Sequence, residues 1–393
     1  MRRTMFLAMT VLSSMAFAPP AMAAPSDTGR KVEAATPSDT NRKIDAAAQA
    51  LMQEHGVPGL VIAITRDGRH EFHPYGVASR QTKAKVSPDT LFEVGSISKT
   101  YTATLATYAE ALGKLSLGDS PARFVPALQG SEFAKLSLIH LGTHTGGGFP
   151  LQVPDAVRND AQLIAYLKAW TPQYAAGTQR TYANPSIGML GVVAAKSLDQ
   201  PFTQAMEKTL FPLLGLSHTY IDVPAAKMGD YAQGYNKQDA PVRVNPGVLA
   251  AEAYGVKTSA RDLIHFVDAN MNAAGNDAIH RAIRQTHVGY YRVGDMVQDL
   301  AWEQLAYPAT LDALLAANAG TLNSHSHPAT ALTPPSAPRD DVWINKTGST
   351  NGFGGYVAFV PARKVGVVIL ANKNYPNEAR VRLAYQILEV LIK

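Results

Sequence analysis

The two ends of this chain carry the clearest strand signals in its sequence. Near the start, an apolar run at residues 60–65 is followed by Asp67-Gly68, a dipeptide typical of tight hairpin turns, and by a second run at 70–75. Near the end, the runs 355–360 and 365–371 flank another short turn. Because hairpins from distant parts of a chain can pair in one sheet, we expect both ends to contribute to a single antiparallel sheet.

The long middle of the chain, about 115–329, is richer in helical patterns that are interrupted by glycine and proline loops. One helix is predicted at 160–170. The sequence therefore predicts an α/β (α+β) fold, in which an antiparallel sheet built from both chain ends is flanked by helices and carries a mainly helical insertion. The α/β part would comprise about 40–114 and 330–393. The proline-rich segment 328–338 is expected to be a surface connector.

Residues 1–23 have the pattern of a signal peptide. Arg2 and Arg3 precede an apolar run at 5–18, which is too short to span a bilayer, and Ala21-Met22-Ala23 matches a cleavage site. We expect export, a mature chain of one folded unit at 24–393, and a periplasmic location in a host with two membranes. No later apolar run is long enough for a membrane helix, so we expect no stable membrane association.

Composition excludes several classes of function. The 393 residues include no cysteine, which excludes disulfides, thiolate catalysis and cysteine zinc sites. The net charge of +5 comes without a basic run, so we expect no nucleic-acid partner. His140 with His144, and His325 with His327, lack further ligands, so we expect no metal, and no glycine pattern indicates a cofactor. Nothing in the sequence indicates an oligomer, and a monomer is the default expectation.

Three short motifs point to serine chemistry. Ser96-Ile97-Ser98-Lys99 is the only S-x-x-K in the sequence, and the residues after it are predicted to be helical. On a helix, residues three apart share a face, so Lys99 would lie beside the Ser96 hydroxyl and could activate it. Tyr182-Ala183-Asn184 and Lys346-Thr347-Gly348 follow in order. Each motif alone is as compatible with an ordinary helix start, loop or strand end, and it is their joint occurrence that indicates acyl transfer.

This set resembles the serine penicillin-recognising enzymes, and most closely the class C β-lactamases. The resemblance covers nearly the whole mature chain and includes residues 92–100, 151–155, 182–188, 251–257, 346–359 and 370–377. It implies a hydrolase that opens the β-lactam ring of cephalosporins and penicillins through an acyl-enzyme on Ser96, with no cofactor. The chain departs from the usual family sequence at 142–146 and at Ala250, which we expect near the substrate-facing rim.

The resemblance also implies the roles of the catalytic residues. Ser96 would be the nucleophile, and Tyr182 and Lys99 are assigned jointly as the general base. A free phenol has a pKa of about 10, which two nearby cations, Lys99 and Lys346, would lower. Lys346 is expected on an edge strand, where its charge can meet a substrate carboxylate. The backbone N–H groups of Ser96 and Ser349 would form the oxyanion hole.

A further group of residues is expected to bind substrate, namely Gln152, Asn184, Tyr254, Thr347, Gly348, Asn377 and Arg380. Asn184 would hydrogen-bond both Lys99 and a substrate amide, and Gln152 would supply a second amide group. Asn377 and Arg380 would hold the substrate carboxylate.

Several supporting roles and alternatives complete the interpretation. Gly348 is expected to keep its strand open for the close approach of a ligand, and Tyr254 to form a wall of the pocket. Arg180 and Glu303 are expected to pair and to brace the loop that carries Tyr182. Since a fold does not determine a function, a D-Ala-D-Ala carboxypeptidase or an esterase of the same fold is the main alternative, and an acylated binding module without turnover is another.

Overall fold

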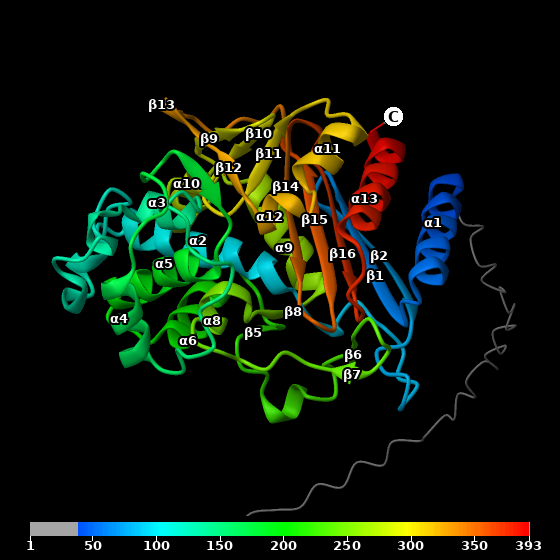
Figure 1. The fold of residues 1–393 in the computed structure, drawn as a ribbon. Helices are drawn as coiled ribbons and strands as arrows, with labels where there is room; N and C mark the ends of the chain where they lie inside the picture. Colours follow the sequence, from blue (N-terminus) through cyan, green and yellow to red (C-terminus); the bar gives the residue numbers. More distant parts are fainter. Residues whose placement is uncertain (1–37, 393) are drawn as a thin grey trace, which may run out of the picture. The chain divides into compact units, whose positions relative to one another are not determined.

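A nine-stranded antiparallel sheet forms the centre of the structure, a computed structural model that describes residues 38–392 (Figure 1). Its strand order is β13-β9-β10-β11-β14-β15-β16-β1-β2. The two chain ends supply β1 (Gly59–Arg66), β2 (Arg69–Gly76), β14 (Val342–Ser349), β15 (Gly354–Val360) and β16 (Val365–Ala371). The first strand pairs directly with the last, which confirms the predicted fold class. The predicted signal peptide lies outside the described residues.

Four further strands extend the sheet on one side. They are β9 (Gly289–Val293), β10 (Met296–Gln298), β11 (Glu303–Ala306) and β13 (Thr330–Ser336). The first three come from the stretch expected to be mainly helical, where runs of three to five residues leave little periodic signal. The expectation of a connector was wrong for Thr330–Ser336. This proline-rich segment is instead one of the two edge strands of the sheet, a position where a missing N–H is tolerated.

The helices and the shorter elements connect and cover this sheet. The helices are α1 (Asp39–His55), α2 (Ser98–Ala111), α3 (Leu138–Gly142), α4 (Asp160–Ala169), α5 (Asn184–Ser197), α6 (Phe202–Gln204), α7 (Phe211–Leu213), α8 (Ala250–Tyr254), α9 (Ala260–Met271), α10 (Ala278–Thr286), α11 (Leu311–Ala317), α12 (Thr321–Ser324) and α13 (Asn377–Ile392). Short strands are β3 (Leu91–Glu93), β4 (Gln179–Thr181), β5 (Thr219–Tyr220), β6 (Gly234–Tyr235), β7 (Pro241–Val242), β8 (Lys257–Ser259) and β12 (Ser326–Pro328). Within residues 38–392, no helix has the length and apolarity needed to cross a membrane.

Helices cover both faces of the central strands because neighbouring strand residues point to opposite faces. Leu60, Ile62 and Ile64 of β1 belong to an apolar cluster with residues of α1 and α13. Val61 and Ala63 belong to a second cluster with residues of α2 and α9. In Figure 1, α13 and α9 accordingly flank the strands from different sides. The continuous apolar runs of the central strands therefore reflect burial on both faces.

The cluster that β16 shares with α1 and α13 provides a test of this packing. Ile369 is fully buried in that cluster. We expect Ile369→Ala to lower the free energy of unfolding by about 2–5 kcal/mol, because it removes buried carbons and leaves a cavity. Urea denaturation measures the loss. The control is Leu213→Ala, whose side chain is 47% exposed and should cost less than about 0.5 kcal/mol. Equal losses for both variants would contradict the packing described here.

Candidate active site

Ser96 lies in a short 3₁₀ turn, η1 (Gly95–Ile97), between strand β3 and helix α2. The neighbouring β8 segment holds this turn in place. The Val94 N–H donates to the Val256 carbonyl at 3.1 Å, and the Val256 N–H donates to Ser98 Oγ at 3.0 Å. Within residues 91–100, Ser96 alone is not buried. The structure thus places Ser96 at the start of a helix, as predicted, and presents its hydroxyl on an otherwise buried segment.

Two glycines allow the Ser96 turn to lie directly against β14. Gly95 has a φ of +50°, and a Cβ atom added there would lie 2.4 Å from the Ser349 carbonyl oxygen. A Cβ atom added at Gly348 would lie 2.0 Å from the Val94 carbonyl oxygen. Gly348 therefore leaves room for the backbone of the Ser96 turn; because it also lines the pocket, its expected role in the close approach of a ligand stays a prediction. The contact brings Ser96 and Ser349 next to each other, as an oxyanion hole made from both would require.

Strand β14 changes its pairing partners along its length. Its residues 342–345 pair with β11 on one side, whereas residues 346–349 have, within the described part of the chain, a strand partner only in β15. The free side of this second half contacts η1. The predicted edge position of Lys346 therefore holds for that half alone, because the strand as a whole is internal to the sheet.

Two buried lysines lie beside Tyr182. Lys99 Nζ donates to Ser96 Oγ at 3.0 Å and to the Ala253 carbonyl at 2.8 Å. Lys99 Nζ and Lys346 Nζ each lie 5.1 Å from the centroid of the Tyr182 ring. All three side chains are almost completely buried. The fold therefore brings the three sequence motifs together, as expected.

The environment shifts the pKa values of Tyr182 and Lys99 in ways that suit proton transfer. Burial alone would raise the pKa of Tyr182, but the charges of Lys346 and Lys99 and the nearby Ser96 hydroxyl outweigh it, so that pKa is lowered. Burial is also the main cause of the lowered pKa of Lys99, and the Lys346 charge adds to it while Tyr182 opposes it. A phenol and an ammonium whose pKa values are both lowered can exchange a proton with Ser96.

Arg180 and Glu303 form the expected pair next to this cluster. Arg180 Nη2 lies 2.8 Å from Glu303 Oε1, and both side chains are buried. Arg180 Nε also donates to Gln298 Oε1 at 2.6 Å, and its guanidinium lies 5.3 Å from the Tyr182 ring centroid. Glu303 Oε1 lies 3.6 Å from Lys346 Nζ. The carboxylate therefore compensates two of the buried cations that surround Tyr182.

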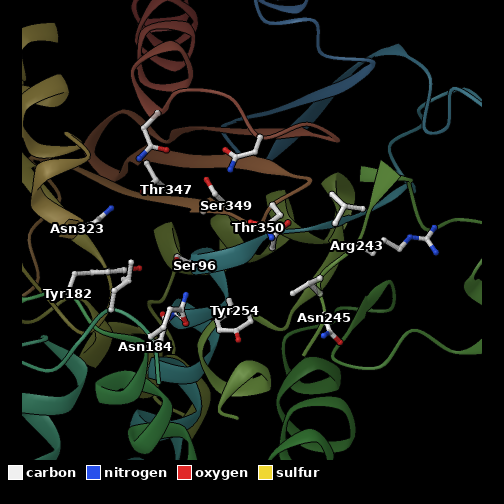
Figure 2. A pocket seen from close by; sticks show the side chains of 18 residues that line it. Ser96, Tyr182, Asn184, Arg243, Asn245, Tyr254, Asn323, Thr347, Ser349 and Thr350 are labelled. Atoms are coloured by element: carbon white, nitrogen blue, oxygen red, sulfur yellow. Dashed lines mark hydrogen bonds between the residues drawn. The ribbon is translucent and has the colours of Figure 1, made fainter. Parts of the chain in front are cut away.

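A pocket of about 490 Å³ opens in front of Ser96, a volume suited to a small molecule (Figure 2). The predicted site residues that line it are Ser96, Gln152, Tyr182, Asn184, Tyr254, Thr347, Gly348, Ser349 and Asn377. It is also lined by residues that the sequence analysis missed, including Val242, Arg243, Val244, Asn245, Asn323, Thr350, Asn351 and Asn374. Thr350 and Asn351 follow Ser349, which directly follows the last motif, and could have been found by extending that motif. Residues 242–245 and Asn323 carry no pattern, and only the fold brings them to the site.

Arg380 does not face this pocket, in contrast to the expectation. Its side chain is fully buried, and it donates to the Gly348 carbonyl and to Ser349 Oγ, both at 2.8 Å, and to Asn374 Oδ1 at 3.0 Å. Burial lowers its pKa to about 10, so it remains a cation at neutral pH. Its terminal nitrogens donate to β14 and to the segment before α13, whereas its Nε has no partner among residues 38–392, so Arg380 supports Ser349 from outside the pocket. Asn377, at the start of α13, does line the pocket.

The expected hydrogen bond between Asn184 and Lys99 is also absent from the described residues. Asn184 is the first residue of α5, and Pro185 is tolerated at the next position because it lies in the first helical turn. Its Nδ2 donates to Gln152 Oε1 at 2.9 Å, while its Oδ1 has no partner among residues 38–392. The two amides predicted to bind substrate therefore hold each other, and Asn184 retains a free acceptor.

We expected the two departures from the usual family sequence near the substrate-facing rim of the pocket, but neither lies there. Residues 142–146 are buried, and so is Ala250 at the start of α8. The His144 ring lies against the Tyr182 ring with centroids 4.4 Å apart, and His144 Nδ1 accepts the Ala183 N–H at 3.3 Å. Burial, followed by the charges of the nearby cations, lowers the pKa of His144 well below its usual value. His144 is therefore neutral and packs behind Tyr182 without adding charge.

Comparisons with known proteins agree with this geometry. The family model described as Beta-lactamase matches residues 44–392. A curated β-lactamase of Lysobacter lactamgenus is 54% identical over 341 residues, which cover 86% of this chain and 89% of that protein. The chain therefore belongs to the β-lactamase family, which confirms the stated resemblance and the prediction of a hydrolase.

Solved structures are similar over nearly the same span. A crystal structure described as a β-lactamase/D-alanine carboxypeptidase from Pseudomonas syringae has a TM-score of 0.88 at 56% identity, covering 90% of this chain and 99% of that one. A class C β-lactamase in complex with cefoxitin has a TM-score of 0.87 at 49% identity, covering 89% and 98%. The structural neighbours thus include class C β-lactamases.

The contact between the Ser96 turn and β14 can be tested by adding one methyl group at Gly348. Gly348→Ala would place that group against the Val94 carbonyl, and neither backbone can move without separating Ser96 from Ser349. We expect the unfolding free energy to fall by about 1–3 kcal/mol in urea titrations, as in other overpacked sites. Gly320→Ala is the control, because an added Cβ there meets nothing within 4 Å. An unchanged urea midpoint for Gly348→Ala would contradict the close contact.

The influence of Lys346 on Tyr182 can be measured by titration. Lys346→Met removes the charge that contributes most to lowering the pKa of Tyr182, so we expect that pKa to rise by about one unit or more. The chain has 16 tyrosines, so the tyrosinate absorbance is measured as a difference against the matching Tyr182→Phe protein. The exposed Lys168→Met serves as the control and should leave the titration unchanged. A Tyr182 pKa that is unaffected by Lys346→Met would show that this lysine does not tune the phenol.

Proposed function

We propose that this protein is a secreted class C serine β-lactamase that hydrolyses the β-lactam ring of cephalosporins and penicillins through an acyl-enzyme on Ser96. The observation that carries the proposal is the hydrogen bond of 3.0 Å from Lys99 Nζ to Ser96 Oγ, beside the buried Tyr182, in a pocket of about 490 Å³. Membership of the β-lactamase family supports the substrate class.

In the acylation step, Ser96 Oγ attacks the lactam carbonyl carbon and passes its proton to the Tyr182–Lys99 pair. The carbonyl oxygen takes up negative charge, which the backbone N–H groups of Ser96 and Ser349 stabilise. As the bond between the carbonyl carbon and the ring nitrogen breaks, the same proton is delivered to that nitrogen. The product is an ester on Ser96 with an opened ring.

In the deacylation step, a water molecule attacks the ester carbonyl and gives one proton to the Tyr182–Lys99 pair. The ester bond breaks, the proton returns to Ser96 Oγ, and the acid product leaves. Both steps need one group that first accepts a proton and then donates it. A lowered pKa of Tyr182 and a lowered pKa of Lys99 suit that task near neutral pH.

The remaining site residues would orient the substrate. The amide groups of Gln152 and Asn184 lie at one end of the pocket and would bind the substrate side-chain amide. Thr347 and Asn377 line the pocket on the β14 side and would bind the substrate carboxylate, with the Lys346 charge buried behind them. Tyr254 would form a wall of the pocket.

We extend the proposal to a periplasmic enzyme that acts as a monomer. The signal-peptide pattern of residues 1–23 supports export. All residues of the proposed site come from one chain, so the reaction as written needs no second subunit.

A D-Ala-D-Ala carboxypeptidase remains the second candidate. The similar Pseudomonas syringae protein is described by both activities, and both reactions use an acyl-serine intermediate. The two functions differ in the lifetime of the ester that a β-lactam forms. A β-lactamase releases it rapidly, whereas a peptidase inhibited by the drug keeps it.

The decisive experiment follows ring opening of a chromogenic cephalosporin by the mature protein. We expect turnover that falls by about 10⁴-fold or more in Ser96→Ala, because the nucleophile is removed. Ser116→Ala, an exposed serine outside the pocket, should behave as the wild type. Turnover in Ser96→Ala close to that of the wild type would contradict the assignment. A persistent mass increase on Ser96 without turnover would instead support the carboxypeptidase or the acylated binding module.

A further inference from the structure

A single buried carboxylate connects three separate segments at one side of the pocket. Glu93 is the last residue of β3 and is 1% exposed. Its Oε1 accepts the Tyr231 hydroxyl at 2.6 Å and the Val244 N–H at 2.8 Å, and its Oε2 accepts the Thr350 hydroxyl at 2.5 Å. Burying a carboxylate is costly unless donors compensate for the lost water, and these three donors do so. The reaction steps above use none of these hydrogen bonds.

The segments that Glu93 holds form part of the pocket. Arg243, Val244, Asn245 and Thr350 all line it, and we call these four residues the distal wall. Figure 2 shows Arg243, Asn245 and Thr350 on the opposite side of Ser96 from Tyr182. In the same view Tyr254 lies between Asn184 and Asn245, so an acyl side chain whose amide is held at Gln152 and Asn184 would extend past Tyr254 toward the distal wall.

Little regular structure holds the distal wall in position. Residues 243–247 belong to no helix or strand, so their placement depends on side-chain contacts. Arg243 Nη2 donates to the Tyr231 carbonyl at 2.7 Å, and its guanidinium lies 4.0 Å from the Tyr231 ring centroid. The next residue, Val244, gives its N–H to Glu93. Arg243 and Val244 are therefore both held by the hydrogen-bonded pair of Glu93 and Tyr231.

Glu93 also links the distal wall to the nucleophile. Only Val94 and Gly95 separate it from Ser96, and Gly95 lies against β14. Burial, and then the Glu93 charge, raise the pKa of Tyr231, so its hydroxyl stays protonated and remains a donor. The spacing between Ser96 and the distal wall is thus set through one carboxylate.

We propose that Glu93 is a positioning residue that sets the shape of the distal wall and thereby selects β-lactams by the size of the acyl side chain. The proposal rests on the proposed function for its substrate class. When Glu93 cannot accept hydrogen bonds from the Thr350 and Tyr231 hydroxyls and the Val244 N–H, the residues of the distal wall are no longer fixed in position. It then has more room for bulky side chains and packs less well against compact ones.

The kinetic test compares two cephalosporins, one with a compact and one with a bulky, branched acyl side chain. In Glu93→Gln and in Thr350→Val, we expect the ratio of kcat/KM for the bulky over the compact substrate to rise about tenfold, mainly through KM. The matched control is Glu207→Gln. Glu207 also holds backbone through its carboxylate, which accepts the N–H groups of Ile221 and Asp222 at 2.8 and 2.9 Å, but neither of these two residues lines the pocket. A parallel change for both substrates, or the same ratio change in the control, would overturn the proposal.

A second measurement does not depend on turnover. Hydrogen–deuterium exchange of peptides that cover residues 240–248 should become faster in Glu93→Gln and in Tyr231→Phe, and should stay unchanged in Glu207→Gln. Unchanged exchange in both test variants would overturn the positioning role. If the wild type fails to hydrolyse either cephalosporin while exchange rises as expected, the proposed function fails and the role of Glu93 in the distal wall stands.

Discussion

The contact between the backbone of the Ser96 turn and strand β14 is the constraint on which the rest of this site depends. A turn and a strand approach this closely only where neither carries a Cβ atom at the contact, and Gly95 and Gly348 meet that condition from opposite sides. The contact occupies the half of β14 that β11 leaves unpaired. The pairing of β14 with β11 therefore stops where the Ser96 turn packs against β14. As a result, the backbones of Ser96 and Ser349 lie together.

Buried charges then organise the groups around this contact. Lys99 and Lys346 share the surroundings of Tyr182, and Glu303 compensates for Lys346. Arg380 donates to the Gly348 carbonyl and the Ser349 hydroxyl of β14, and Glu93 holds the distal wall. Such groups are expensive to bury and add little to stability by themselves. Arg380 and Glu93 bond to backbone groups, and they hold the end of β14 and the irregular segment 243–247 in a defined geometry.

Much of the fold could be predicted because several of its helices and strands lie where the local sequence pattern is strong. The β1–β2 hairpin and the helix after Ser96 follow from turn residues and periodicity, and each was found close to its predicted place. The prediction missed β9 to β11, whose few residues show too little alternation, and it read Thr330–Ser336 as a connector because prolines usually interrupt strands. Arg380 illustrates a different limit. Its position in the sequence suggested a substrate contact, but whether an arginine at a helix start points into a pocket or beneath it depends on packing.

The sequence by itself determined the chemistry available to this protein: a serine with a lysine three residues later, a tyrosine, a second lysine before a glycine, and no cysteine. It also determined the two-ended sheet, because strand and turn signals are local. Only the tertiary structure decided which groups meet. Glu93, Thr350 and Val244 are separated by more than a hundred residues in the chain and carry no shared pattern, yet they meet at one carboxylate. Side-chain direction and burial arise from long-range packing, which no local pattern encodes.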